Sequence, residues 1–184
     1  MPSDREARRD AYVTKARAEL AGLASRGVCM SGNSFSSVLF VKGRLNAGEK
    51  DGRPLLSGED GTALRKSLEA LGYAPEDWAA VSCSLDTGKP LPAETLRRAV
   101  AALDPATLVL CDEAAAAAVR EAYADELAAL PDFAEAMLAP GVVALVLGMR
   151  VLNLGGFEAA LADKRQKQVM WARLKRVPPL GEPI

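Results

Sequence analysis

The stretch LFVKGRLNAGEKDGRPLLSGEDGTAL, from Leu39 to Leu64, does more than any other part of the sequence to predict the fold. Its first residues end a predicted strand over residues 36–41, which is apolar throughout its centre, as a strand buried on both faces should be. A loop with five glycines follows, and a helix is expected to begin near Asp60. Because ligands in open α/β sheets bind just beyond the carboxyl ends of strands, we expect a binding site in this loop.

Strand-like and helix-like segments alternate along the rest of the chain. We predict further strands over residues 79–83 and 107–111 and a last strand ending near Leu154, where residues 142–147 and 150–154 form either two strands or one long strand. Helices are expected over residues 4–25, 61–71, 92–103, 113–130, 132–138, 157–161 and 164–177, with Asp112 as the cap of the helix that follows it. This order predicts an α/β fold, a three-layer α/β/α sandwich with a central sheet of four parallel strands.

Length and composition predict one domain over residues 1–184, with an N-terminal helix inside residues 1–27 and a loose tail at 178–184. Hydrophobic residues make up 49% of the chain, enough for a substantial core. No apolar run has the roughly 18 residues that a membrane helix needs, and the charged N-terminal residues do not resemble a signal peptide. We therefore expect a cytoplasmic protein without membrane partners.

The ionisable residues restrict the chemistry that the chain could perform. Its net charge is −1, with 23 basic and 24 acidic residues, which argues against a surface covered with positive charge for binding nucleic acid. The chain has no histidine, so catalysis by histidine and metal ligation by histidine are both excluded. Three separate cysteines, Cys29, Cys83 and Cys111, are too few for a typical iron–sulfur or zinc site, and we expect reduced, mostly buried thiols and no metal or other cofactor. A lowered pKa at Cys111 is the competing interpretation.

Several motifs resemble the uracil-DNA glycosylase superfamily, in particular its iron–sulfur bacterial and archaeal branch. In that branch the first strand is followed by Gly-Glu-Ala-Pro-Gly and then by Gly-Arg-Pro-Phe-Val-Gly; here KGRLN occupies residues 42–46 and GRPLLSG occupies residues 52–58. The segments LDPATLVL at 103–110 and RVLNLGGFEAAL at 150–161 are similar to the third strand and the closing motif. The resemblance implies the sandwich fold, with the first and third strands as neighbours.

The same resemblance implies that the reaction has been lost. The acidic residue that serves the hydrolytic water falls on Gly43, the phenylalanine that stacks on uracil on Leu55, and the histidine of the last motif on Gly156. The asparagine that reads the uracil edge falls near Ala79. Only Cys83 has a counterpart among the cluster cysteines, since the next one falls at about Arg98.

We therefore expect a uracil-DNA glycosylase-like protein that is non-catalytic and keeps a binding cleft for nucleic acid or another ligand. The alternatives are a divergent DNA glycosylase for uracil or a damaged base, in which Glu49 or Asp51 orients water, and a structural or interaction protein. DNA, bound weakly and without sequence preference, an unknown protein or a small ligand are the expected partners. The candidate binding residues are Gly43, Asn46, Gly52, Arg53, Pro54, Leu55, Asn153, Gly155, Gly156, Lys164 and Lys167.

Overall fold

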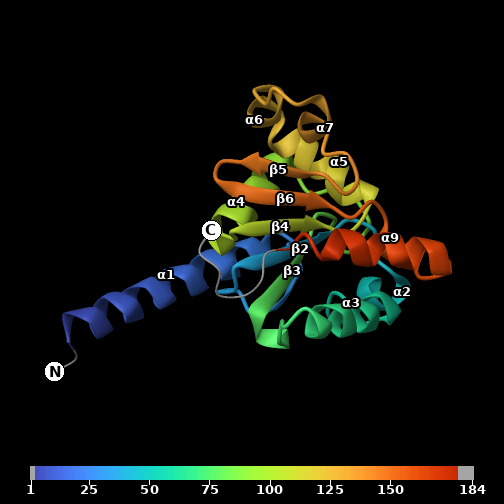
Figure 1. The fold of residues 1–184 in the computed structure, drawn as a ribbon. Coiled ribbons are helices and arrows are strands. Elements are labelled where there is room, and N and C mark those ends of the chain that lie inside the picture. The colour runs from blue at the N-terminus through green and yellow to red at the C-terminus, as the bar shows by residue number, and fades with distance from the viewer. Residues whose placement is uncertain (1–2, 178–184) are drawn as a thin grey trace.

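The computed structural model describes residues 3–177 and has an α/β fold built on one mixed sheet of six strands (Figure 1). The predicted tail at 178–184 lies outside the described residues. Along the sheet the strands follow the order β1-β3-β2-β4-β6-β5. Among the described residues, no helix combines the length and the apolar character needed to cross a membrane.

The middle of the sheet is parallel and its two edges are antiparallel. The middle strands are β2 (Val38–Lys42), β3 (Trp78–Ser82), β4 (Thr107–Leu110) and β6 (Met149–Asn153), and each runs parallel to its neighbour. The first and third predicted strands, β2 and β4, are neighbours as expected. The edges are β1 (Met30–Gly32) on β3 and β5 (Val143–Val146) on β6.

The prediction of a four-stranded sheet is therefore wrong in its strand number. The three residues of β1 are too few to produce a hydrophobic pattern. At the other edge, β5 and β6 form a hairpin about Leu147 and Gly148, whose φ values of 50° and 78° are those of a type I′ turn. The last predicted strand is thus two antiparallel strands, which was one of the two alternatives.

The helices lie close to the expected segments, except at a break at Tyr123 and at α2, which was not predicted. They are α1 (Asp4–Ser25), α2 (Ala47–Lys50), α3 (Glu59–Ala70), α4 (Ala93–Leu103), α5 (Glu113–Ala122), α6 (Ala124–Ala128), α7 (Phe133–Ala136), α8 (Phe157–Ala160) and α9 (Lys164–Leu174). The helix predicted over 113–130 is broken at Tyr123, which leaves the helical conformation between α5 and α6. The unpredicted α2 begins with a capping box between Asn46 and Glu49.

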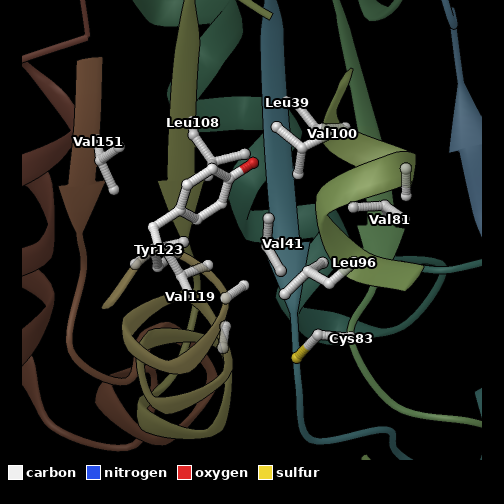
Figure 2. Close-up of a cluster of buried hydrophobic side chains, with 14 of the residues drawn as sticks. Leu39, Val41, Val81, Cys83, Leu96, Val100, Leu108, Val119, Tyr123 and Val151 are labelled. Atoms are coloured by element: carbon white, nitrogen blue, oxygen red, sulfur yellow. The ribbon is translucent and has the colours of Figure 1, made fainter. Parts of the chain in front are cut away.

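Hydrophobic clusters lie on both faces of the sheet, because successive side chains of a strand point to opposite sides. Leu39 and Val41 of β2 belong to a cluster that includes residues of α1, α4 and α5, and Figure 2 shows part of it around Tyr123. Val38 and Phe40 belong to the other cluster, with residues of α3, α8 and α9. Every residue of β2 is buried, which explains the continuous apolar pattern of this strand.

Candidate functional site

A cleft of about 400 Å³ opens at the carboxyl ends of the parallel strands. Lys42 is the last residue of β2, Cys111 and Asp112 follow β4, and Gly155 and Gly156 follow β6; all of them line the cleft. The loop and helices after β2 contribute Leu56 and Asp60, and α8 contributes Glu158. The cleft therefore lies at the edge of the sheet where the sequence predicts a site.

A buried lysine, Lys42, lines this cleft. The Nζ atom of Lys42 lies 2.5 Å from Oε1 of Glu49 and 2.5 Å from Oδ2 of Asp60, and all three side chains are at most 2% exposed. Oε2 of Glu158, a half-exposed side chain, lies 3.6 Å from the same Nζ. Lys42, Glu49 and Asp60 are called the buried triad below.

The triad keeps Lys42 charged. Burial alone lowers the pKa of Lys42, but the hydrogen bonds to Asp60 and Glu49, together with their charges, outweigh burial and raise its pKa above the usual value. A lysine of this kind is a poor general base or nucleophile at neutral pH, because both roles need the unprotonated amine. The triad thus holds the strand end and the loop together rather than supplying a reactive group.

Glu49, a candidate catalytic acid, is fully engaged. Besides contacting Lys42, its Oε1 accepts a hydrogen bond from the Asn46 backbone N–H at 2.9 Å, and its Oε2 accepts one from the Leu56 N–H at 2.9 Å. Asp51, the other candidate, is exposed at the C-terminal end of α2 and does not line the cleft. Neither carboxylate is placed to orient a water molecule inside the cleft.

Hydrogen bonds to the Asp112 carboxylate connect the end of β2 to the start of α5. As predicted, this carboxylate caps α5 by accepting a hydrogen bond from the Ala115 N–H at 2.8 Å. The same carboxylate also accepts hydrogen bonds from the backbone N–H groups of Gly43 and Arg44. These contacts bring Gly43 so close to α5 that a Cβ atom on it would lie 2.6 Å from the Ala114 Cβ and 2.6 Å from the Ala115 nitrogen.

The remaining candidates of the first loop are spread over its surface and interior. Asn46 caps α2 through its Oδ1, which accepts from the Glu49 N–H at 2.9 Å. Arg53 and Pro54 are exposed, and so is Gly52, which has a φ of 92°. Leu55 is 5% exposed and belongs to the hydrophobic cluster of α3, so its side chain does not line the cleft.

At the end of β6, the structure brings two of the three candidates to the cleft. Gly155 and Gly156 line it, whereas the Asn153 side chain is completely buried. The Nδ2 of Asn153 donates to the Leu138 carbonyl at 2.8 Å and its Oδ1 accepts from the Gly155 N–H at 2.9 Å. Asn153 therefore shapes the loop and is not available to a ligand.

The base-reading asparagine of the superfamily was expected to fall near Ala79, and this expectation is wrong. Ala79 is the second residue of β3 and lies at the amino end of that strand, whereas the cleft is at the carboxyl ends. The residues at the carboxyl end of β3 are Ser82 and Ser84, both buried, and the Ser84 hydroxyl donates to the Gly43 carbonyl at 2.6 Å.

The basic candidates lie on α9, which packs against α8. Lys164 and Lys167 are exposed and line none of the cleft. Arg173 of the same helix is instead used inside the protein, where it donates to the Leu154 carbonyl at 2.5 Å. The basic residues of α9 therefore differ in role: Lys164 and Lys167 are exposed, whereas Arg173 holds the loop after β6.

Most of the residues that line the cleft are not among the candidate site residues, and Lys42, Asp60 and Glu158 are three charged examples. The sequence predicts only that a helix begins near Asp60, whereas in the structure Gly58 is the N-cap of α3 and Asp60 contacts Lys42. One signal was available, because a lysine at the end of a wholly apolar strand needs a buried partner, and Glu49 and Asp60 are acidic residues in the following loop.

The thiols have the character of structural cysteines. Burial, with a smaller contribution from the Asp112 charge, raises the pKa of Cys83 to about 12 and raises that of Cys111 well above its usual value. Burial likewise raises the pKa of the half-buried Cys29. The prediction that the pKa of Cys111 is lowered is therefore wrong, since burial of the thiol outweighs the effect of the neighbouring helix terminus.

Residues 3–177 contain no group of three or more histidine, cysteine or acidic side chains arranged to hold a metal ion. No protein-family model matches the chain, and no curated protein matches it.

Proposed function

We propose that this chain is a uracil-DNA glycosylase-like domain, a three-layer α/β/α sandwich around the four parallel strands, which binds a ligand in its cleft without cleaving a glycosidic bond. The parallel order β3-β2-β4-β6, with helices on both faces and the cleft at the carboxyl ends, supports this assignment. The resemblance of the loop and closing motifs supports it independently.

The close approach of Gly43 to α5 carries the non-catalytic part of the proposal. In the superfamily the water-activating acid stands at this position, but a Cβ here would lie 2.6 Å from the Ala115 backbone. Real Cβ atoms do not approach backbone so closely, so any side chain at residue 43 requires the strand end or α5 to move. The lack of room for a Cβ atom at residue 43 therefore supports the absence of an acid at this position.

The charges around the cleft indicate which ligand it accepts. The charged residues that line it are Lys42, Arg44, Asp60, Asp112, Glu113 and Glu158. Acidic groups outnumber basic ones, and Lys42 is already neutralised inside the triad. A phosphate in the cleft would meet these carboxylates, so the cleft favours an uncharged or cationic molecule of about nucleoside size over a DNA strand.

Binding of nucleosides and nucleotides tests this ligand class. We expect a panel of nucleosides to include one that binds more tightly than its 5′-monophosphate, because the monophosphate adds negative charge beside Glu113 and Glu158. The measurement is isothermal titration calorimetry or ligand-observed NMR with the wild type. Ala159→Trp, which places a bulky side chain in the cleft, should abolish binding, whereas Ala117→Trp, an exposed change outside the cleft, should not.

Tighter binding of the nucleotide, or of single-stranded DNA that is lost when Lys164 and Lys167 are replaced by Ala, would favour the nucleic-acid alternative. In that case binding should fall steeply with salt, since each neutralised phosphate releases condensed counterions.

Uracil excision tests the loss of the reaction. We expect no release of uracil from single- or double-stranded DNA, because losing a single stabiliser of the transition state commonly costs a factor of about 100 to 1,000 and several are missing here. Gly43→Asp, which restores an acid, should also be inactive and should lower the stability of the fold. Excision by the wild type that disappears in Asp51→Ala would instead establish the divergent-enzyme alternative.

A further inference from the structure

The hairpin of β5 and β6 exposes an uncharged edge of the sheet. Between Glu135 and Arg150 no charged residue occurs. Exposed large hydrophobic side chains also concentrate here: of the seven such residues in the described part of the chain, four lie between residues 133 and 147. They are Phe133, Met137, Leu145 and Leu147, of which Leu145 is 60% exposed and Leu147 is 70% exposed.

The geometry of the turn determines which backbone groups of β5 point outward. Because Leu147 and Gly148 form a two-residue type I′ turn, Val146 and Met149 are a hydrogen-bonded pair. Pairs along an antiparallel ladder alternate, so the N–H and C=O groups of Val143 and Leu145 point away from β6. No hydrogen bond within residues 3–177 involves these outward groups.

The edge also lacks the usual protection against pairing. Natural edge strands carry a charge, a proline or a bulge, are very short, or are covered by a helix or loop. β5 is contacted by α7, but it has no charge, proline or bulge over Val143–Val146. The opposite edge differs, because β1 has only three residues and its Ser31 hydroxyl donates to the Leu55 carbonyl of the first loop. One edge strand is therefore hydrogen-bonded to a loop, whereas the outward backbone groups of Val143 and Leu145 at the other edge have no hydrogen bond within residues 3–177.

We infer that β5 pairs with β5 of a second copy of this chain, antiparallel and about a two-fold axis at Ala144. Val143 of one copy then lies opposite Leu145 of the other, and their outward amides and carbonyls become hydrogen-bonded. Near such an axis each side chain meets its own copy or a close neighbour, so any charge would face a like charge. The absence of charge over residues 138–149 fits a self-complementary contact and offers nothing to select a charged partner.

Sedimentation equilibrium of the wild type tests this inference. We expect a species of twice the 19.4 kDa chain mass. Leu145→Lys and Leu145→Glu should each be folded by circular dichroism and monomeric, with dissociation constants at least about tenfold larger. Tyr12→Lys is the matched control, because Tyr12 is 59% exposed on the distant α1 and its replacement should leave the dimer intact.

Mixing the two charged variants distinguishes strand pairing from a general loss of apolar surface. The introduced lysine and glutamate side chains would lie near one another across the axis, so an equimolar mixture of Leu145→Lys and Leu145→Glu should form a heterodimer again. A monomeric wild type would overturn the inference. So would a dimer that Leu145→Lys leaves unchanged, or a mixture of the charged variants that stays monomeric.

Discussion

Lys42→Met is expected to lower the free energy of unfolding by about 3–5 kcal/mol, a large part of the roughly 5–15 kcal/mol that stabilises a typical domain. Methionine fills a similar volume, so little of this loss comes from packing. The loss comes from Glu49 and Asp60, whose carboxylates would remain buried without the ammonium that lies 2.5 Å from each of them. An uncompensated charge in a buried site costs far more than an exposed ion pair contributes.

Urea denaturation of the variant and of two matched controls measures this effect. In Lys42→Met/Glu49→Gln/Asp60→Asn all three charges are removed together, and most of the lost stability should return because no buried charge remains unpaired. Lys15→Met removes the lysine of an exposed pair with Glu19 on α1 and should change the stability by about 0.5 kcal/mol or less. A Lys42→Met variant as stable as Lys15→Met would contradict a structural role for the triad.

The sequence signals that predicted the fold are local ones. α1 and β2 each contain a run of residues with one pattern that is long enough to predict the element, and their predicted positions agree with the structure. β1 is too short to have a pattern, and α2 is a single turn whose signal is the spacing of Asn46 and Glu49. The break at Tyr123 is invisible in an alanine-rich segment, because alanine favours the helix on both sides of it.

The site is harder to predict because its contacts join residues that are distant in sequence. Lys42 and Asp60 are 18 residues apart, and Asp112 holds Gly43 across 69 residues. Asp112 was predicted as a helix cap because capping is local, but its bonds to the first loop depend on β2 and β4 being adjacent. The glycines of the loop were visible in the sequence, yet only the structure separates those required by packing from those that face solvent.

Gly61 is a glycine required by packing, and Gly61→Ala is expected to destabilise the protein by about 3 kcal/mol or more. A Cβ atom on Gly61 would lie 1.5 Å from the Leu56 carbonyl oxygen and 2.2 Å from its carbon, so the backbone at Leu56 must move. Leu56 is itself held by hydrogen bonds, since its N–H donates to Glu49 and its carbonyl accepts from Arg65. Moving it therefore also disturbs the buried triad.

Gly22→Ala is the same chemical change as Gly61→Ala, but we expect it to have the opposite effect on stability. Gly22 lies within α1, and a Cβ atom added there meets nothing within 4 Å. Because alanine favours a helix over glycine by about 0.8–1.0 kcal/mol, this variant should be slightly more stable than the wild type. Thermal and urea unfolding of both variants compare the two sites directly. Equal effects at residues 22 and 61 would mean that Leu56 does not contact Gly61 as described, and that the loop over the cleft is free to adopt another conformation.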